Sequence, residues 1–161
     1  MVVGGDFNVA LWNLNSGQQV KLLGKHKSKV NSVSFSINKS HVASASDDGI
    51  IFLHNIENSK SYNLPLKEKT EEIDPILSAK FSPHQGRLLA HCGDSGNVLI
   101  WDTARLELIK TFHSHSTICS EVIFNPKDKN SLCSGGLDKK MVIYDLNSKK
   151  QVIYNIIFFQ F

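Results

Sequence analysis

The chain has 161 residues, of which 41% are hydrophobic, and a formal net charge of +3. This length and hydrophobic content fit one ordinary globular domain, and so small a charge gives no reason to expect a nucleic-acid-binding protein. The three cysteines, an odd number, indicate free thiols in a reducing compartment, and the first residues lack the basic start and apolar core of a signal peptide. We therefore expect a cytoplasmic protein.

Short runs of alternating apolar residues, bounded by turn-forming residues, follow one another along the chain. Alternation with a period of two is the pattern of a β-strand, and no stretch requires a helix longer than one turn. Residues 1–13 align with 133–145, so we expect the chain to start at the second strand of a four-stranded unit. Further strands are predicted at 18–23; at 30–35, 41–46 and 50–54; at 76–81, 87–92, 97–102 and 106–112; and at 118–124, 131–135, 141–145 and from 151 onward.

The third strand of each unit ends on a large ring side chain that is followed by Asn or Asp. Successive rings lie 42, 47 and 43 residues apart, in the pairs Trp12-Asn13, His54-Asn55, Trp101-Asp102 and Tyr144-Asp145. A period in the forties that closes on Trp-Asp is typical of a propeller blade. On this pattern the chain resembles the WD40-repeat family. Phe35, Phe81 and Phe124 fall 19 or 20 residues before the rings, which predicts one equivalent core position.

The resemblance implies an all-β fold, a WD40 β-propeller fragment that forms an open arc of about three four-stranded antiparallel blades plus a partial blade. A closed ring needs about four to eight blades, so we expect the remaining blades of its own propeller to be missing. The predicted divisions are 1–23 for the partial blade (strands b to d), 24–66, 67–112 and 113–155 for blades, and 156–161 for an apolar tail. We expect the sequence to be truncated or misread in that tail, which is too short to span a membrane.

The family ties each blade together with a His, a Ser or Thr, an Asp and a Trp, and two units carry such a set. The implied logic is that Asp holds the imidazole, while imidazole and hydroxyl reach the ring on the third strand. The matching residues are His26, Ser44, Asp48 and His54 in one unit, and His115, Ser134, Asp138 and Tyr144 in another. The partial unit keeps Asp6 and Trp12. The unit that ends at Trp101 has Glu72, His91 and Ser95 at these positions, so we expect it to depend on strand packing.

These polar residues also suggest catalysis or metal binding. A Ser-His-Asp triple that recurs once per repeat indicates architecture, because catalysis needs one distinctive constellation in a pocket. His113, His115 and Cys119 have a loose zinc-like spacing, but no second closely spaced couple accompanies them. We expect no enzyme activity, no cofactor and no metal.

Basic residues in the loops after the first and third strands of the units offer a candidate partner contact. A solvated rim is the simpler interpretation, and a face for an acidic partner, such as a tubulin tail or RNA, is the alternative. Those loops lack interleaved aromatic residues, which disfavours nucleic acid. The candidate contact residues are Lys39, Arg105, Lys127, Lys129, Lys149 and Lys150.

Two local segments narrow the resemblance within the family. The segments GLDKKMVIYD (136–145) and FLHN (52–55) are similar to the middle blades of the Nedd-family WD-repeat proteins, which bring the γ-tubulin ring complex to centrosomes and spindles. This implies a scaffold for microtubule nucleation at the centrosome or spindle pole, with γ-tubulin ring complex components as partners. The alternative is a substrate receptor of a ubiquitin ligase or another WD40 scaffold, although Arg105 follows Trp101-Asp102 one residue too late for the receptor motif.

Overall fold

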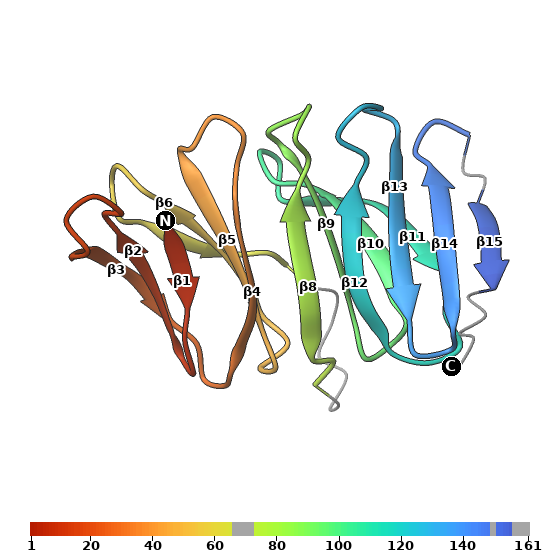
Figure 1. The fold of residues 1–161 in the computed structure, drawn as a ribbon, viewed down its shortest axis with the longest axis horizontal. Helices are drawn as coiled ribbons and strands as arrows, with labels where there is room; N and C mark the ends of the chain where they lie inside the picture. The colour runs from red at the N-terminus through yellow and green to blue at the C-terminus, as the bar shows by residue number, and fades with distance from the viewer. Residues whose placement is uncertain (66–72, 149–150, 156–161) are drawn as a thin grey trace.

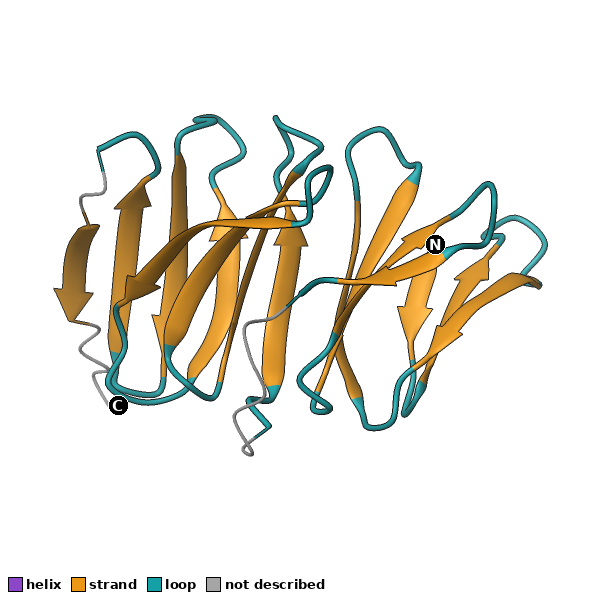
Figure 2. Cartoon of the chain, turned by 180° about the vertical axis from the view of Figure 1, so that it is seen from behind, coloured by secondary structure: helices purple, strands orange, loops and turns teal. Residues whose placement is uncertain are grey.

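The computed structural model describes residues 1–65, 73–148 and 151–155, and these residues form strands and turns without a helix (Figure 2). The strands make four separate antiparallel sheets that stand side by side in an open arc (Figure 1). Each sheet is a meander in which strands adjacent in sequence are also adjacent in space. The predicted all-β arc of three four-stranded sheets and one smaller sheet is therefore confirmed.

The first two sheets lie at the N-terminal end of the arc. The β1–β3 sheet consists of β1 (Val2–Gly4), β2 (Asn8–Trp12) and β3 (Gln19–Lys25). The β4–β7 sheet consists of β4 (Val30–Phe35), β5 (His41–Ser46), β6 (Ile51–Asn55) and the short β7 (Ser61–Asn63).

The other two sheets complete the arc. The β8–β11 sheet consists of β8 (Ile76–Phe81), β9 (Leu88–Gly93), β10 (Asn97–Asp102) and β11 (Glu107–His113). The β12–β15 sheet consists of β12 (Cys119–Phe124), β13 (Ser131–Gly136), β14 (Lys140–Asp145) and β15 (Gln151–Asn155). The predicted apolar tail, residues 156–161, lies outside the described residues.

The hydrophobic core is divided among the three spaces between neighbouring sheets. Val9 and Leu23 of the first sheet pack with Val30 and Val42 of the second. The next cluster joins the β4–β7 and β8–β11 sheets, and the third joins the β8–β11 and β12–β15 sheets. Each sheet is thus stabilised chiefly by burial against its neighbour, because alternate side chains of a strand point to opposite faces.

The three equivalent phenylalanines differ in burial. Phe81 and Phe124 are buried, as expected of core residues, whereas Phe35 is 36% exposed, so its assignment to the core is wrong. Phe81 and Phe124 lie in core clusters shared with the preceding four-stranded sheet, whereas the sheet that precedes β4 is the three-stranded β1–β3 sheet, which β4 contacts through β1. A smaller neighbouring sheet leaves part of this side chain uncovered.

Candidate interaction surface

A chain of buried hydrogen bonds crosses the β4–β7 sheet. His26 Nδ1 lies 3.1 Å from Asp48 Oδ2, His26 Nε2 lies 2.8 Å from Ser44 Oγ, and Ser44 Oγ lies 2.8 Å from His54 Nε2. Because the Asp48 carboxylate can only accept, His26 donates from Nδ1, Ser44 donates to His26 Nε2, and His54 donates to Ser44. Burial, with a smaller effect of His26, lowers the pKa of His54 to about 4. His54 is therefore neutral, and the hydrogen bonds link it on the third strand to Asp48 in the turn before that strand. We call these four side chains the β4–β7 network.

The same arrangement crosses the β12–β15 sheet with a phenol at its end. His115 Nδ1 lies 2.9 Å from Asp138 Oδ1, and Ser134 Oγ lies 2.7 Å from both His115 Nε2 and the Tyr144 hydroxyl. Burial raises the pKa of Tyr144. A Cβ at Gly136 would lie 2.4 Å from His115 Nδ1, so the imidazole occupies space that only glycine leaves free. These four side chains are the β12–β15 network.

The β8–β11 sheet contains no such network among the residues that the structure describes. His91 and Trp101 are buried with their rings stacked at a centroid distance of 6.2 Å, and neither His91 Nε2 nor Trp101 Nε1 has a hydrogen-bond partner there. Burial lowers the pKa of His91 to about 3, so its imidazole is neutral. Ser95 is exposed and donates its backbone N–H to Asp74, and Glu72 lies outside the described residues.

The two networks have the geometry of structural links. The side chains of His26 and His115 have an exposed fraction of 0%, and both ring nitrogens of each lie within hydrogen-bond distance of a partner.

In the β1–β3 sheet, Asp6 is exposed and Trp12 is half-buried. Within the described parts of the chain, no three His, Cys, Asp or Glu side chains gather as a metal site, and no helix could cross a membrane.

Exposed basic side chains gather on the turns that follow the first and third strands of the sheets. We call them the basic face: Lys39, Lys60, Arg105, Lys127 and Lys129. The turns between β4 and β5, β8 and β9, and β12 and β13 lie along one edge of the arc (Figure 1). Two of the candidate contact residues, Lys149 and Lys150, lie outside the described residues.

Acidic residues on the same turns are directed to backbone N–H groups. The Asn130 N–H, with Ser131, holds the pKa of Asp128 below its usual range. The Ser148 hydroxyl and the Asn147 N–H do the same for Asp145. These carboxylates thus order their own loops, and Lys127 and Lys129 are exposed on the turn that contains Asp128.

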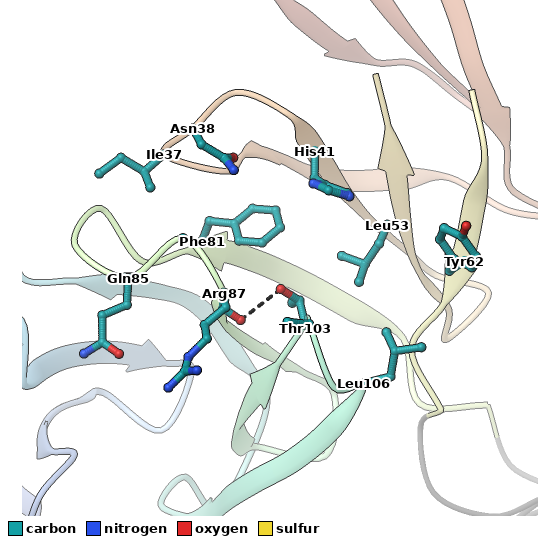
Figure 3. Close-up of a pocket in the computed structure, with 12 residues that line it drawn as sticks. Ile37, Asn38, His41, Leu53, Tyr62, Phe81, Gln85, Arg87, Thr103 and Leu106 are labelled. Carbon is teal, nitrogen blue, oxygen red and sulfur yellow. Dashed lines mark hydrogen bonds between the residues drawn. The ribbon is translucent and has the colours of Figure 1, made fainter. Parts of the chain in front are cut away.

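A cavity that the sequence did not predict lies between the β4–β7 and β8–β11 sheets on the same edge (Figure 3). Its volume is about 810 Å³, and we call it the inter-sheet cavity. The turns before β5, before β9 and before β11 supply its rim, with side chains that include Ile37, Arg87 and Leu106. Strand patterns within one repeat give no sign of it, because it forms only where turns of two repeats meet.

Comparison with known proteins agrees with the repeat architecture. The profile of the WD40 family, described as "WD domain, G-beta repeat", matches residues 17–55 and 106–145. The chain is 31% identical to Protein NEDD1 of Homo sapiens over 154 residues, which are 94% of this chain and 23% of that protein. It is 28% identical to the GATOR2 complex protein WDR24 of Homo sapiens over 153 residues, 88% of this chain and 18% of that protein. The chain thus spans less than a quarter of the length of either relative.

Proposed function

This chain carries WD40 repeats, and on that premise we propose that it is a non-enzymatic scaffold that binds other proteins. The described polar networks are buried and repeated, which supports an architectural role for them. What is left for recognition is the surface of the turns, where rigid scaffolds ordinarily carry their binding residues.

We further propose that the chain targets γ-tubulin-dependent microtubule nucleation to the centrosome or spindle pole in the cytoplasm. The observation that carries this proposal is the similarity to Protein NEDD1, which extends over 94% of this chain. The segments 52–55 and 136–145 support it, since they are the parts that resemble the Nedd-family WD-repeat proteins. The partners would be centrosomal proteins or components of the γ-tubulin ring complex.

A second candidate is a scaffold in a different assembly. The similarity to the GATOR2 complex protein WDR24 favours it, although the identity of 28% is lower. In that case the same turns would bind a protein of another complex, and the chain would not visit the spindle poles.

The basic face, extended by Lys149 and Lys150, is our candidate contact for an acidic partner. Exposed charges are screened over about 8 Å at physiological ionic strength, so binding through this face is expected to weaken as salt increases. Under this proposal, localisation to the spindle pole depends on the turns of the basic face. Recruitment of γ-tubulin depends on other contacts.

The test compares charge reversal on two opposite edges of the arc, in the protein tagged at its own genomic locus. The first variant changes Lys127, Lys129, Lys149 and Lys150 to Glu, and the matched control changes Lys25, Lys27, Lys29 and Lys139, on the other set of turns, to Glu. We expect the first variant to lose spindle-pole localisation and keep γ-tubulin co-purification, and the control to keep both. Unchanged localisation in both would make the basic face a solvated rim. Co-purification of the unmodified protein with another complex, without pole localisation, would overturn the centrosomal assignment.

A further inference from the structure

The inter-sheet cavity is large enough to hold several residues of a peptide. Its volume of about 810 Å³ falls within the range of about 300–1,000 Å³ that ligand pockets have. It is bounded by residues of both the β4–β7 and the β8–β11 sheets, so a bound segment would contact two sheets at once.

One end of the cavity is apolar. Leu53 and Phe81 are buried, and Leu106 and Tyr62 extend the same surface outward (Figure 3). Tyr62 is 47% exposed, which leaves its ring available to a partner. This end suits a large aliphatic or aromatic side chain, since burial of apolar surface is the main source of affinity there.

Leu106 stands at a backbone position where a leucine is unfavourable. Its φ is +57°, in the left-handed region, and the equivalent positions of the two preceding turns are Gly17 (φ +64°) and Ser59 (φ +61°). A branched side chain in this region costs free energy that glycine does not pay, and such residues concentrate at functional sites. The Leu106 side chain packs on the core between the two sheets and lines the cavity.

The other end of the cavity carries the charged Arg87 and the polar Gln85 and Asn38, with Ile37 beside them. The Arg87 side chain is 62% exposed and makes one ion pair, in which Nε lies 3.6 Å from Asp102 Oδ2. Asp102 Oδ1 already accepts from the N–H groups of Ala104 and Arg105, so this carboxylate is engaged by its own turn. Among the described residues that line the cavity none is acidic. The terminal nitrogens of Arg87 are thus placed to form a bidentate pair with an incoming carboxylate.

The polar rim is held in place before any ligand binds. Thr103 Oγ1 donates to the Arg87 carbonyl over 2.9 Å and joins two of the turns, as the dashed line in Figure 3 marks. The Asn55 amide lies 3.3 Å from His41 Nε2, and Ser40 Oγ lies 2.7 Å from His41 Nδ1. A preformed rim lowers the entropy lost on binding.

We propose that the inter-sheet cavity docks a short extended segment of a partner protein in which a large apolar residue stands close to an aspartate or glutamate. The apolar residue enters the end formed by Leu53, Phe81 and Leu106, and the carboxylate pairs with Arg87. This rests on the proposed scaffold function and names the chemistry of the partner. Nucleic acid would satisfy Arg87 but would leave the aliphatic end unused.

The experiment selects peptides from a random dodecapeptide phage library on the intact chain. We expect enriched sequences to hold a large apolar residue and a carboxylate within about three positions, since an extended chain rises about 3.3 Å per residue. The enriched peptide is then synthesised with a fluorescent label, and its affinity is measured by anisotropy.

Three variants locate the site. Leu106→Gly relieves the left-handed turn but removes packing on the core, so these effects on the melting temperature oppose each other, and we expect affinity about tenfold weaker at a temperature where the variant is folded. Arg87→Gln should weaken binding about tenfold and abolish the preference for Glu over Gln in the peptide. The matched control, Lys29→Gln, removes one exposed charge on the other set of turns and should change the affinity less than about twofold.

The possible results separate this site from the basic face. Selection of no peptide, unchanged affinity of Leu106→Gly, or equal competition by a uridine dodecamer would overturn the docking proposal. None of these results bears on the localisation assay with charge-reversed lysines. A loss of affinity in Lys29→Gln as large as that in Arg87→Gln would make the effect one of general charge and likewise overturn the cavity as the site.

Discussion

The β4–β7 and β8–β11 sheets are neighbours with the same strand order, yet they hold their strands together differently. In the first, an aspartate fixes the direction of three successive hydrogen bonds that end on the third strand. In the second, the equivalent space contains two stacked rings, each with a nitrogen that has no hydrogen-bond partner among the described residues, and every residue of β9 is buried. Apolar burial on both faces is therefore sufficient to hold the strands of such a sheet together. The polar network adds a specific link between strands, and its formation requires desolvation of the polar groups.

The largest expected effect on stability comes from removing the carboxylate at which the β4–β7 network begins. Asp48→Ala leaves the buried His26 Nδ1–H and the solvent-exposed Lys27 N–H without their acceptor. We expect a loss of about 3 kcal/mol in the free energy of unfolding, measured by urea denaturation. The matched control is Asp6→Ala in the β1–β3 sheet, where the carboxylate is exposed and the expected change is below about 0.5 kcal/mol. A loss below about 1 kcal/mol for Asp48→Ala would mean that the network adds little to stability.

The second test uses the neutral histidines that both sheets contain. His54 and His91 have pKa values lowered to about 4 and about 3, whereas an unfolded histidine takes up a proton below about 6.5. The contribution of these neutral histidines to the free energy of unfolding is therefore fully present above about pH 6.5. It is lost as the pH falls toward their pKa values in the folded state. Between pH 7 and pH 5 each should account for about 2 kcal/mol of lost stability.

Substitution of His91 should remove its share of that loss. His91→Leu is expected to flatten the dependence of unfolding free energy on pH between 7 and 5, with stability at pH 7 unchanged or higher, because the unpaired Nε2 is gone. His113→Gln, at an exposed histidine, is the matched substitution for comparison. An equally steep pH dependence in His91→Leu would show that other groups cause the acid sensitivity.

The smallest expected effect comes from the end of the β12–β15 network. Tyr144→Phe removes the hydroxyl that shares a hydrogen bond with Ser134 Oγ and leaves the ring in the core. We expect a loss of about 1 kcal/mol in the free energy of unfolding. Tyr62→Phe removes an exposed hydroxyl and should cost less than about 0.5 kcal/mol. Equal losses in the two variants would contradict a stabilising role for the buried phenol.

Much of the fold follows from periodicity within one repeat. Each strand with predicted bounds begins and ends within two residues of its observed bounds, because alternation and turn residues are local signals. The repeat spacing also singles out the side chains that hydrogen bonds join in the β4–β7 and β12–β15 sheets. The short strand β7 received no predicted range.

Features that depend on two sheets at once were beyond sequence reasoning. The exposure of Phe35 depends on the size of the neighbouring sheet, and the inter-sheet cavity depends on turns of different repeats. Leu106 could have drawn notice, since it occupies the turn position at which Gly17 stands. Nothing in a single repeat, however, says that this turn faces a hollow.

The division of the core among the spaces between sheets has a consequence for how the arc loses its structure. Since no sheet keeps an apolar interior of its own, each one is as stable as the interfaces on its two sides permit. Amide hydrogens should therefore exchange with solvent slowest in β9, whose sheet packs against a neighbour on both faces, and fastest in β1 and β7, three-residue strands at the edges of their sheets. Unfolding is then coupled between neighbouring sheets, so a destabilising substitution in one sheet lowers the stability of the adjacent sheets more than that of distant ones.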